Sequence, residues 1–214
     1  IYSRYPIIRK YAFADSISTF NFGGVMIDVD GKPVRVFNTW LHYLPDMRLV
    51  PTDKSKEEIL AWEMEGTRDE EIHRILTVLR PLLAETDSIM GGDFNVHSHL
   101  DWTEATRNLY LHGGAVVDWP VSIAMEEAGF KDSFREMNPN PVANLGVTWL
   151  TDADSLETEC RMDRIDFIYY HPLESMLSMK DSKLVGPSET VVRGKITEND
   201  SKDKILTPSC IWPS

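Results

Sequence analysis

Cysteine is scarce in this sequence, with only Cys160 and Cys210 among 214 residues. Two cysteines are too few for a disulfide scaffold, and they lack the paired spacing of a zinc site. Long apolar runs are also missing. Because a membrane-spanning helix needs about eighteen consecutive apolar residues, we expect no membrane span.

Basic side chains are outnumbered, since 22 lysines and arginines face 34 aspartates and glutamates and give a net charge of -12. That charge opposes nonspecific attraction to nucleic acid or to anionic lipid, and only a local basic patch could overcome it. Hydrophobic residues make up 42% of the chain and charged residues 26%, as in an ordinary globular protein. We therefore expect one domain over residues 1–214, without internal repeats.

The two ends of the sequence resemble cuts within a folded region. Ile1-Tyr2-Ser3 carries no initiator Met, no basic start and no apolar signal core. The chain closes at Ile211-Trp212-Pro213-Ser214, which is apolar rather than a polar tail. These features favour an internal fragment of a longer protein.

The first half of the chain predicts a β-hairpin followed by a broken helix. Asp30-Gly31 separates β-branched runs over 25–28 and 33–38, and an Asp-Gly pair supplies the positive φ angles that a tight hairpin needs. Residues 57–85 have helical composition, with Gly66 expected to break the helix and Pro81 expected near its end. Apolar residues at helical spacing define one face: Ile72, Ile75, Leu76, Leu79, Leu82 and Leu83.

The second half mixes short strands and helices. Residues 88–92 predict a buried strand that ends in polar residues, 121–128 a helix stopped by Gly129, and 164–170 an alternating strand. On that strand Asp166 is expected to share a face with Arg164. Further strand and a solvated loop are expected over 181–208. Because strands and helices do not alternate regularly, an α+β fold with antiparallel sheets is the expected class.

Gly91-Gly92-Asp93-Phe94-Asn95 is the segment most suited to chemistry. It places a carboxylate and an amide two residues apart, after glycines that allow close backbone approach. A hard cation such as Mg²⁺ prefers carboxylate and water oxygens, and the amide can hydrogen-bond a phosphoryl oxygen or an attacking water. The alternative is a turn in which Asp93 and Asn95 merely satisfy backbone amides.

Five segments together resemble the endonuclease/exonuclease/phosphatase superfamily, which has a deoxyribonuclease-like fold. They match its Ser-Arg-x-Pro-Ile, Asn-x-His-Leu, Gly-Asp-x-Asn, Thr-Trp/Phe and Arg-Ile-Asp-Tyr-Ile elements in the family's order. The matching segments are Ser3-Arg4-Tyr5-Pro6-Ile7, Asn38-Thr39-Trp40-Leu41-His42, Gly92 to Asn95, Thr148-Trp149, and Arg164-Ile165-Asp166-Phe167-Ile168. Five such matches spread over the chain are hard to obtain by accident.

The resemblance implies a four-layer sandwich of two facing, mostly antiparallel sheets flanked by helices, with Mg²⁺ or Mn²⁺ as cofactor. By the family's pattern, Asp93 binds the metal or orients the water, and Asn95 holds the scissile phosphate. Asp166 would orient a catalytic histidine, as a carboxylate does for a general base. The structural alternative for Asp166 is an ion pair with Arg164.

The chain also departs from the family's pattern. The family's metal-binding Glu would precede Ile1, and its closing Ser-Asp-His would begin at Ser214, so the domain is expected to lack its N-terminal strands and C-terminal segment. We therefore expect residues 1–214 alone to be inactive, because one metal carboxylate and the base are missing. Trp40 stands where the family has His, and a β-bulge could bring His42 into that place as a proton donor. Otherwise His42 is a half-buried strand histidine.

Several further residues are candidates for substrate contact. Asn38 lies on the strand of the Asn-x-His-Leu element, and His97 is expected in the loop after Asn95, lining the cleft or facing water. Trp149 belongs to the Thr-Trp element. The tryptophans that could stack on a substrate ring, or pack in the core, are Trp40, Trp102, Trp119 and Trp149.

His97-Ser98-His99-Leu100-Asp101 permits another interpretation, since His-x-His-x-Asp is similar to the metal-binding run of metallo-β-lactamase-fold zinc hydrolases. That fold needs further histidine ligands downstream, and only His112 and His171 follow. In the favoured interpretation Asp101 is a helix cap.

The sequence thus predicts a metal-dependent hydrolase of phosphate esters. Candidate substrates are a small phosphodiester, a phosphorylated sugar, a lipid headgroup or a nucleic acid. A non-catalytic binding module on the same sandwich is the alternative from another class.

Overall fold

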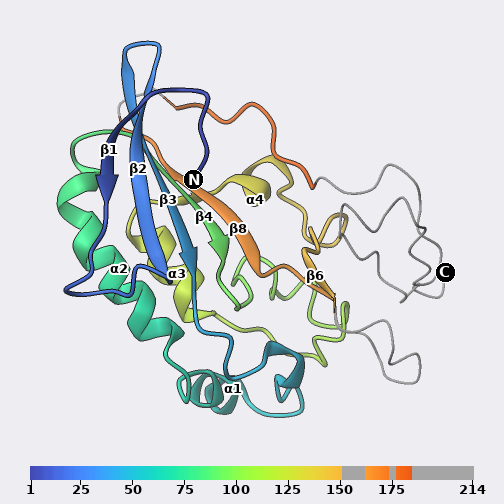
Figure 1. Cartoon of the computed structure of the whole chain (residues 1–214). Coiled ribbons are helices and arrows are strands. Elements are labelled where there is room, and N and C mark those ends of the chain that lie inside the picture. The colour runs from blue at the N-terminus through green and yellow to red at the C-terminus, as the bar shows by residue number, and fades with distance from the viewer. Residues whose placement is uncertain (151–161, 174–176, 185–214) are drawn as a thin grey trace, which may run out of the picture.

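The computed structural model describes residues 1–150, 162–173 and 177–184. They form a six-stranded sheet in the order β1-β2-β3-β4-β8-β5, together with a two-stranded pair, β6-β7 (Figure 1). The strands are β1 Ile7–Tyr11, β2 Phe22–Val29, β3 Lys32–Trp40, β4 Ser88–Asp93, β5 Lys131–Asp132, β6 Trp149–Leu150, β7 Met162–Asp163 and β8 Asp166–His171. The helices are α1 Lys56–Glu63, α2 Arg68–Leu83, α3 Pro120–Glu127 and α4 Ser133–Met137, with a 3₁₀ turn η1 at Met47–Leu49.

The hairpin prediction is confirmed by β2 and β3, which pair antiparallel from Phe22↔Thr39 to Val29↔Lys32. Asp30 and Gly31 both have positive φ, 53° and 85°, as a type I′ turn requires. The Asp28 carboxylate accepts the Gly31 N–H at 2.6 Å, which closes the turn.

The broken helix is confirmed as α1 and α2. A capping box starts α1, since the Ser55 hydroxyl accepts the Glu58 N–H and the Glu58 carboxylate accepts the Ser55 N–H. At Gly66 a Cβ would lie 2.4 Å from the Leu44 carbonyl oxygen, so the chain between the helices needs glycine. Pro81 lies in the last turn of α2, as expected.

The connection through α1 and α2 makes β3 and β4 parallel, from Arg35↔Ser88 to Trp40↔Asp93. The other described strand pairs are antiparallel. The sheet is therefore mixed, because a parallel pair needs a crossover and the helices supply it.

One face of the sheet carries the core. Phe37, Met90 and Tyr169 lie in one row across β3, β4 and β8, and all three are buried. Figure 1 shows α2 and α3 on the same side of the sheet, where α2 contributes the buried Ile72, Ile75 and Leu79 to the same core cluster. Side chains alternate along a strand, so the neighbouring positions point to the opposite face.

The α+β class is confirmed. Within the described ranges, the strands outside the six-stranded sheet are those of the β6-β7 pair, so the second full sheet of the expected sandwich is not formed by these residues. The described part of the tail, 181–184, holds no strand, and the remainder of the expected 181–208 segment lies outside the described residues. No described helix has the length and apolar character that crossing a bilayer requires.

The two glycines at the end of β4 differ in a way that stability measurements can test. A Cβ at Gly92 would lie 1.9 Å from the Thr39 carbonyl oxygen, and the residue has φ 157°. A Cβ at Gly91 meets only ordinary contacts, at 3.6 Å or more. We predict that Gly92→Ala lowers the free energy of unfolding by about 3 kcal/mol, and that Gly91→Ala lowers it by less than about 1 kcal/mol. Urea unfolding measures both, and equal losses would contradict the register of β3 and β4.

Candidate active site

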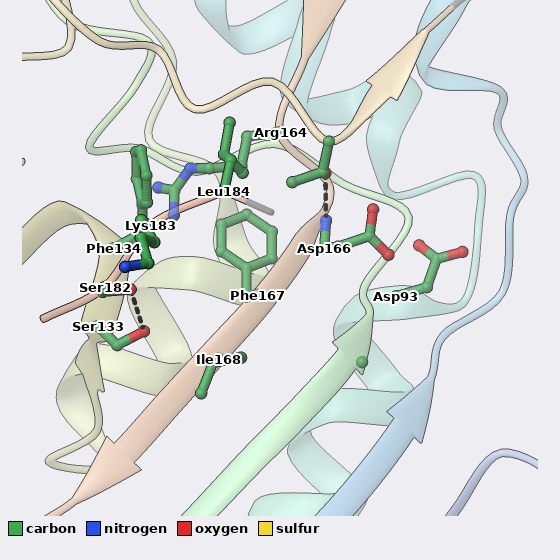
Figure 2. Close-up of a pocket in the computed structure, with 12 residues that line it drawn as sticks. Asp93, Ser133, Phe134, Arg164, Asp166, Phe167, Ile168, Ser182, Lys183 and Leu184 are labelled. Carbon is green, nitrogen blue, oxygen red and sulfur yellow. Dashed lines mark hydrogen bonds between the residues drawn. The ribbon is translucent and has the colours of Figure 1, made fainter. Parts of the chain in front are cut away.

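The candidate site lies where β3, β4 and β8 end side by side. Asp93 is the last residue of β4 and pairs directly with Asp166, the first residue of β8. On the other flank Asp93 pairs with Trp40, the last residue of β3. All three positions belong to the face of the sheet opposite Phe37. Figure 2 shows the Asp166 carboxylate turned toward Asp93.

The turn after β4 fixes Asp93 and Asn95. The Asp93 carboxylate accepts the backbone N–H of Asn95 at 2.9 Å, and Asn95 has φ 51°, a conformation that asparagine tolerates better than most residues. The Asn95 side-chain amide donates to the Leu41 carbonyl oxygen at 2.9 Å. The alternative in which Asp93 and Asn95 form hydrogen bonds with the backbone of a turn is therefore correct for the backbone. One amide N–H of Asn95 ties this turn to the end of β3.

A buried ion pair supports the same turn from the helix side. Arg68 and Glu63 flank the break between α1 and α2, and both side chains are fully buried. The Arg68 guanidinium donates to the carbonyl oxygens of Asn95 at 2.6 Å and Pro45 at 2.9 Å. Burial raises the pKa of Glu63, and the Arg68 charge opposes that rise. Arg68 thus holds the backbone of Asn95 in place.

Asp166 is held by Thr148 rather than by Arg164. The Thr148 hydroxyl oxygen accepts the N–H groups of Ile165 at 3.1 Å and Asp166 at 3.0 Å. Burial raises the pKa of Asp166, and a hydrogen bond from Thr148 opposes the rise. The Arg164 guanidinium points to the other side in Figure 2. The alternative ion pair between Arg164 and Asp166 is not formed, since Arg164 pairs with Asp101 and Asp132. The expectation that the two residues share a strand face is wrong, because β8 begins only at Asp166.

Arg164 belongs to a buried network of two arginines and two aspartates. It donates to Asp101 at 2.9 Å and to Asp132 at 2.9 Å, and Arg135 donates to Asp101 at 3.0 Å. Burial acts to lower the pKa of Arg164, but Asp101 and Asp132 outweigh it and raise that pKa. The Asp101 carboxylate is therefore a partner of two arginines, and its expected role as a helix cap is wrong.

The Asp93 carboxylate has the most perturbed acidity of this site. Burial raises the pKa of Asp93 to about 6, the hydrogen bond from the Asn95 backbone opposes the rise, and the Asp166 charge adds to it. A hydrogen bond from the Trp40 side chain also favours the charged form. Asp93 therefore holds its proton to a higher pH than an ordinary aspartate.

A pocket of about 360 Å³ opens beside the two carboxylates. Asp93, Asp166, Phe167 and Ile168 contribute to its wall (Figure 2). Arg164 and Lys183 also line this pocket. Two acids side by side in its wall attract a cation, and a carboxylate pair with water or phosphate oxygens is a donor set that suits Mg²⁺ or Mn²⁺. Within the described ranges no group of three or more metal-binding side chains comes together, so this donor set is limited to the two carboxylates.

His42 does not take the place of Trp40. The pairing of β3 with β4 runs without a register shift through Trp40↔Asp93, so the bulge that could have moved His42 is not formed. His42 follows the strand and is exposed. Its backbone N–H donates to Glu71 at 2.8 Å, and its ring stacks on Tyr43. Its predicted part in proton transfer stays a prediction.

The expected position of His97, in the cleft or facing water, is wrong. The side chain is 1% exposed and its ring stacks on Trp102 with centroids 4.9 Å apart, so it neither lines the cleft nor faces water. His99 hydrogen-bonds Ser122 at 2.8 Å and Glu126 at 2.8 Å. With Asp101 engaged by arginines, the three residues of the His-x-His-x-Asp run do not converge, which contradicts the zinc-hydrolase interpretation.

The remaining candidates for substrate contact differ in their exposure to solvent. Trp102 and Trp119 are buried in the core, as is common for tryptophan. Trp149 is partly exposed on β6, with the Arg48 guanidinium 5.7 Å from its ring centroid. Asn38 is exposed on β3, opposite Gly91 and on the same face as Asp93, which keeps it a candidate for substrate contact.

Arg68 and Glu63 were not identified from the sequence. Both are charged residues beside a helix break, where the common expectation is a solvated position. Their contact depends on how α1 and α2 turn at Gly66, which hydrophobic periodicity does not report. The one sequence feature that could have indicated this ion pair is that opposite charges stand on the two sides of Gly66.

No protein-family model matches the chain. A curated relative, the uncharacterized protein F14F9.5 of Caenorhabditis elegans, is 37% identical over 125 residues, which cover 53% of this chain and 38% of the relative. The chain thus spans well under half the length of that protein.

Several solved structures resemble this chain in part of their fold. TDP2 of D. rerio, solved with a single-stranded DNA product, is 15% identical with a TM-score of 0.46, over 77% of this chain and 52% of that one. An endonuclease/exonuclease/phosphatase family protein from Leptotrichia buccalis is 15% identical with a TM-score of 0.41, over 78% and 51%. The TRAS1 endonuclease domain is 16% identical with a TM-score of 0.40, over 72% and 52%. At these identities and TM-scores, the similarity concerns the fold and says nothing of the activity of this chain.

The raised pKa of Asp93 predicts a stabilising substitution. An acid whose pKa is higher in the folded than in the unfolded state destabilises the fold while both states are ionised, and this cost disappears as pH falls below about 6. Asp93→Asn should therefore raise the free energy of unfolding at pH 7.5 by about 1 kcal/mol, discounted for solvent exposure. The gain should shrink toward zero near pH 4. Chemical denaturation at both pH values measures it.

The matched control is Asp53→Asn, which changes an exposed carboxylate. Its effect should be within about 0.5 kcal/mol at both pH values. A destabilising Asp93→Asn at pH 7.5 would contradict the electrostatic description of the site.

The arginine network predicts a large loss of stability. Arg164→Ala leaves Asp101 and Asp132 buried without one of their cations, so we expect unfolding to become easier by about 3 to 5 kcal/mol. Arg74→Ala removes the exposed pair with Glu70 and should cost less than about 0.5 kcal/mol. Thermal denaturation compares the two, and similar melting temperatures would show that the network does not hold this end of β8.

Proposed function

We propose that this chain carries part of the active site of a metal-dependent hydrolase of phosphate esters. The observation that carries the proposal is the direct pairing of Asp93 with Asp166 in the wall of a pocket, where Arg164 is paired with Asp101 and Asp132 instead. Two carboxylates placed together without a countercharge between them favour a bound cation.

Asp93, with Asp166 beside it, would hold Mg²⁺ or Mn²⁺. The cation would supply charge neutralisation at the phosphoryl group and a lower pKa for an attacking water. Oxygen ligands of this kind fit both cations.

Asn95 and Asp166 complete the proposed assignment. Asn95 would orient the scissile phosphate with its amide, since its backbone is fixed by Arg68 and its side chain by Leu41. Asp166 would orient an imidazole that acts as the base. His42 is a candidate proton donor, and Asn38 and Trp149 are candidates for substrate contact.

Cation binding tests the first step. Titration of the chain with Mn²⁺, followed by the electron paramagnetic resonance of the free ion, should show one site that Asp93→Asn weakens at least about tenfold, since it removes a charged ligand. Asp53→Asn is the control and should bind as the unchanged chain does. A chain that binds Mn²⁺ no better than its Asp93→Asn variant would contradict the proposal and favour a non-catalytic binding module.

Hydrolysis tests the second step, in the longest reading frame that contains this sequence. Release of 4-nitrophenol from bis(4-nitrophenyl) phosphate should require the cation and stop with a chelator. Asp93→Asn should reduce the rate about a hundredfold or more. A rate that is insensitive to the chelator would exclude metal-assisted attack.

A further inference from the structure

Two aromatic rings stand exposed beside Asp93. Trp40 is 41% exposed and Phe20 is 72% exposed, and their ring centroids are 5.0 Å apart at an interplanar angle of 62°. Trp40 is directly opposite Asp93 in the sheet, on the same face. The rings therefore border the position proposed for the phosphate and its cation.

The pair is held in place by the backbone. The Trp40 N–H donates to the Asn21 carbonyl oxygen at 2.8 Å, and the Asn21 side-chain amide donates to the Trp40 carbonyl oxygen at 2.9 Å. The turn that carries Phe20 is closed by hydrogen bonds from the N–H groups of Asn21 and Phe22 to the Ser18 carbonyl oxygen, each 3.0 Å long. The backbone beneath both rings is thus fixed, and the rings contact each other.

Their exposure contrasts with that of two tryptophans in the core. Trp102 and Trp119 are 1% and 0% exposed. Large apolar rings that are fixed in place yet left in contact with water indicate a surface that binds something. Here the rings adjoin acids that suit a cation-bound phosphate, so the ligand carries a phosphate and a planar group together.

We propose that Trp40 and Phe20 form a stacking platform for the base of a nucleotide whose phosphate lies at Asp93 and Asn95. The proposal rests on the proposed phosphate-ester function and narrows its substrates to nucleotides and nucleic-acid ends. Stacking on an aromatic face tolerates any base, because every base has a π-face.

The test compares a nucleotide with its base-free counterpart. Adenosine 5′-monophosphate and ribose 5-phosphate carry the same phosphate and sugar, so the ratio of their dissociation constants isolates the base. Isothermal titration of the chain in buffer with Mg²⁺ should give a ratio of about ten in favour of the nucleotide, as one stacked base provides.

Variants of Trp40 separate ring stacking from any polar contribution of the indole N–H. Trp40→Phe keeps a ring but loses the indole N–H, and it should retain much of the preference. Trp40→Leu should bring the ratio close to one, whatever it does to phosphate binding. Tyr43→Ser is the control, since Tyr43 is an exposed ring that stacks on His42, and the ratio should not change. Circular dichroism checks that each variant is folded.

The outcomes separate this proposal from the proposed function. A chain that binds Mn²⁺ at Asp93 but binds both phosphates equally overturns the platform and leaves the function in place. A nucleotide preference that survives Trp40→Leu, or failure to bind either compound, also overturns the platform. If the unchanged chain does not bind Mn²⁺, the proposed function itself is contradicted. Binding to phosphatidylcholine vesicles that Trp40→Leu abolishes, without a base preference, would assign the rings to a lipid surface instead.

Discussion

The register that places Asp93 opposite Asp166 is the constraint on which the site depends. Two acids on adjacent strand ends repel one another, and burial adds to the cost of their charges. The backbone hydrogen bonds of β4 and β8 hold them together nevertheless. A cation would remove the repulsion, which is why this arrangement is better explained by ligand binding than by stability.

Buried ion pairs stabilise the segments next to Asp93 and next to Asp166. Arg68 and Glu63 hold the turn after β4, and Arg164 with its two aspartates holds the segment that leads into β8. Both arginines donate to more than one acceptor, so each fixes two segments at once. These arginines therefore keep Asp93 and Asp166 in position, although they would not contact a ligand themselves.

Local chemistry was sufficient to predict much of the fold. The Asp30-Gly31 turn and the break at Gly66 follow from backbone geometry that few residues allow, and the site residues came from a match of ordered motifs. Predictions failed where long-range packing decides. His97 was expected near the cleft but stacks in the core, because the fold brings Trp102 and Trp119 to it. The alternative pairing of Arg164 with Asp166 was wrong, because the partners of Arg164 are 63 and 32 residues away in the sequence.

The central claim is that a divalent cation binds at Asp93, beside Asp166 and near Trp40. Paramagnetic broadening by Mn²⁺ tests it most directly, in a ¹⁵N–¹H spectrum of the chain. The account predicts that the Trp40 indole N–H and the Asn95 backbone N–H broaden first, while the indole N–H signals of Trp102 and Trp119 persist. Broadening that spares Trp40 and Asn95, or that affects all tryptophans equally, would contradict it.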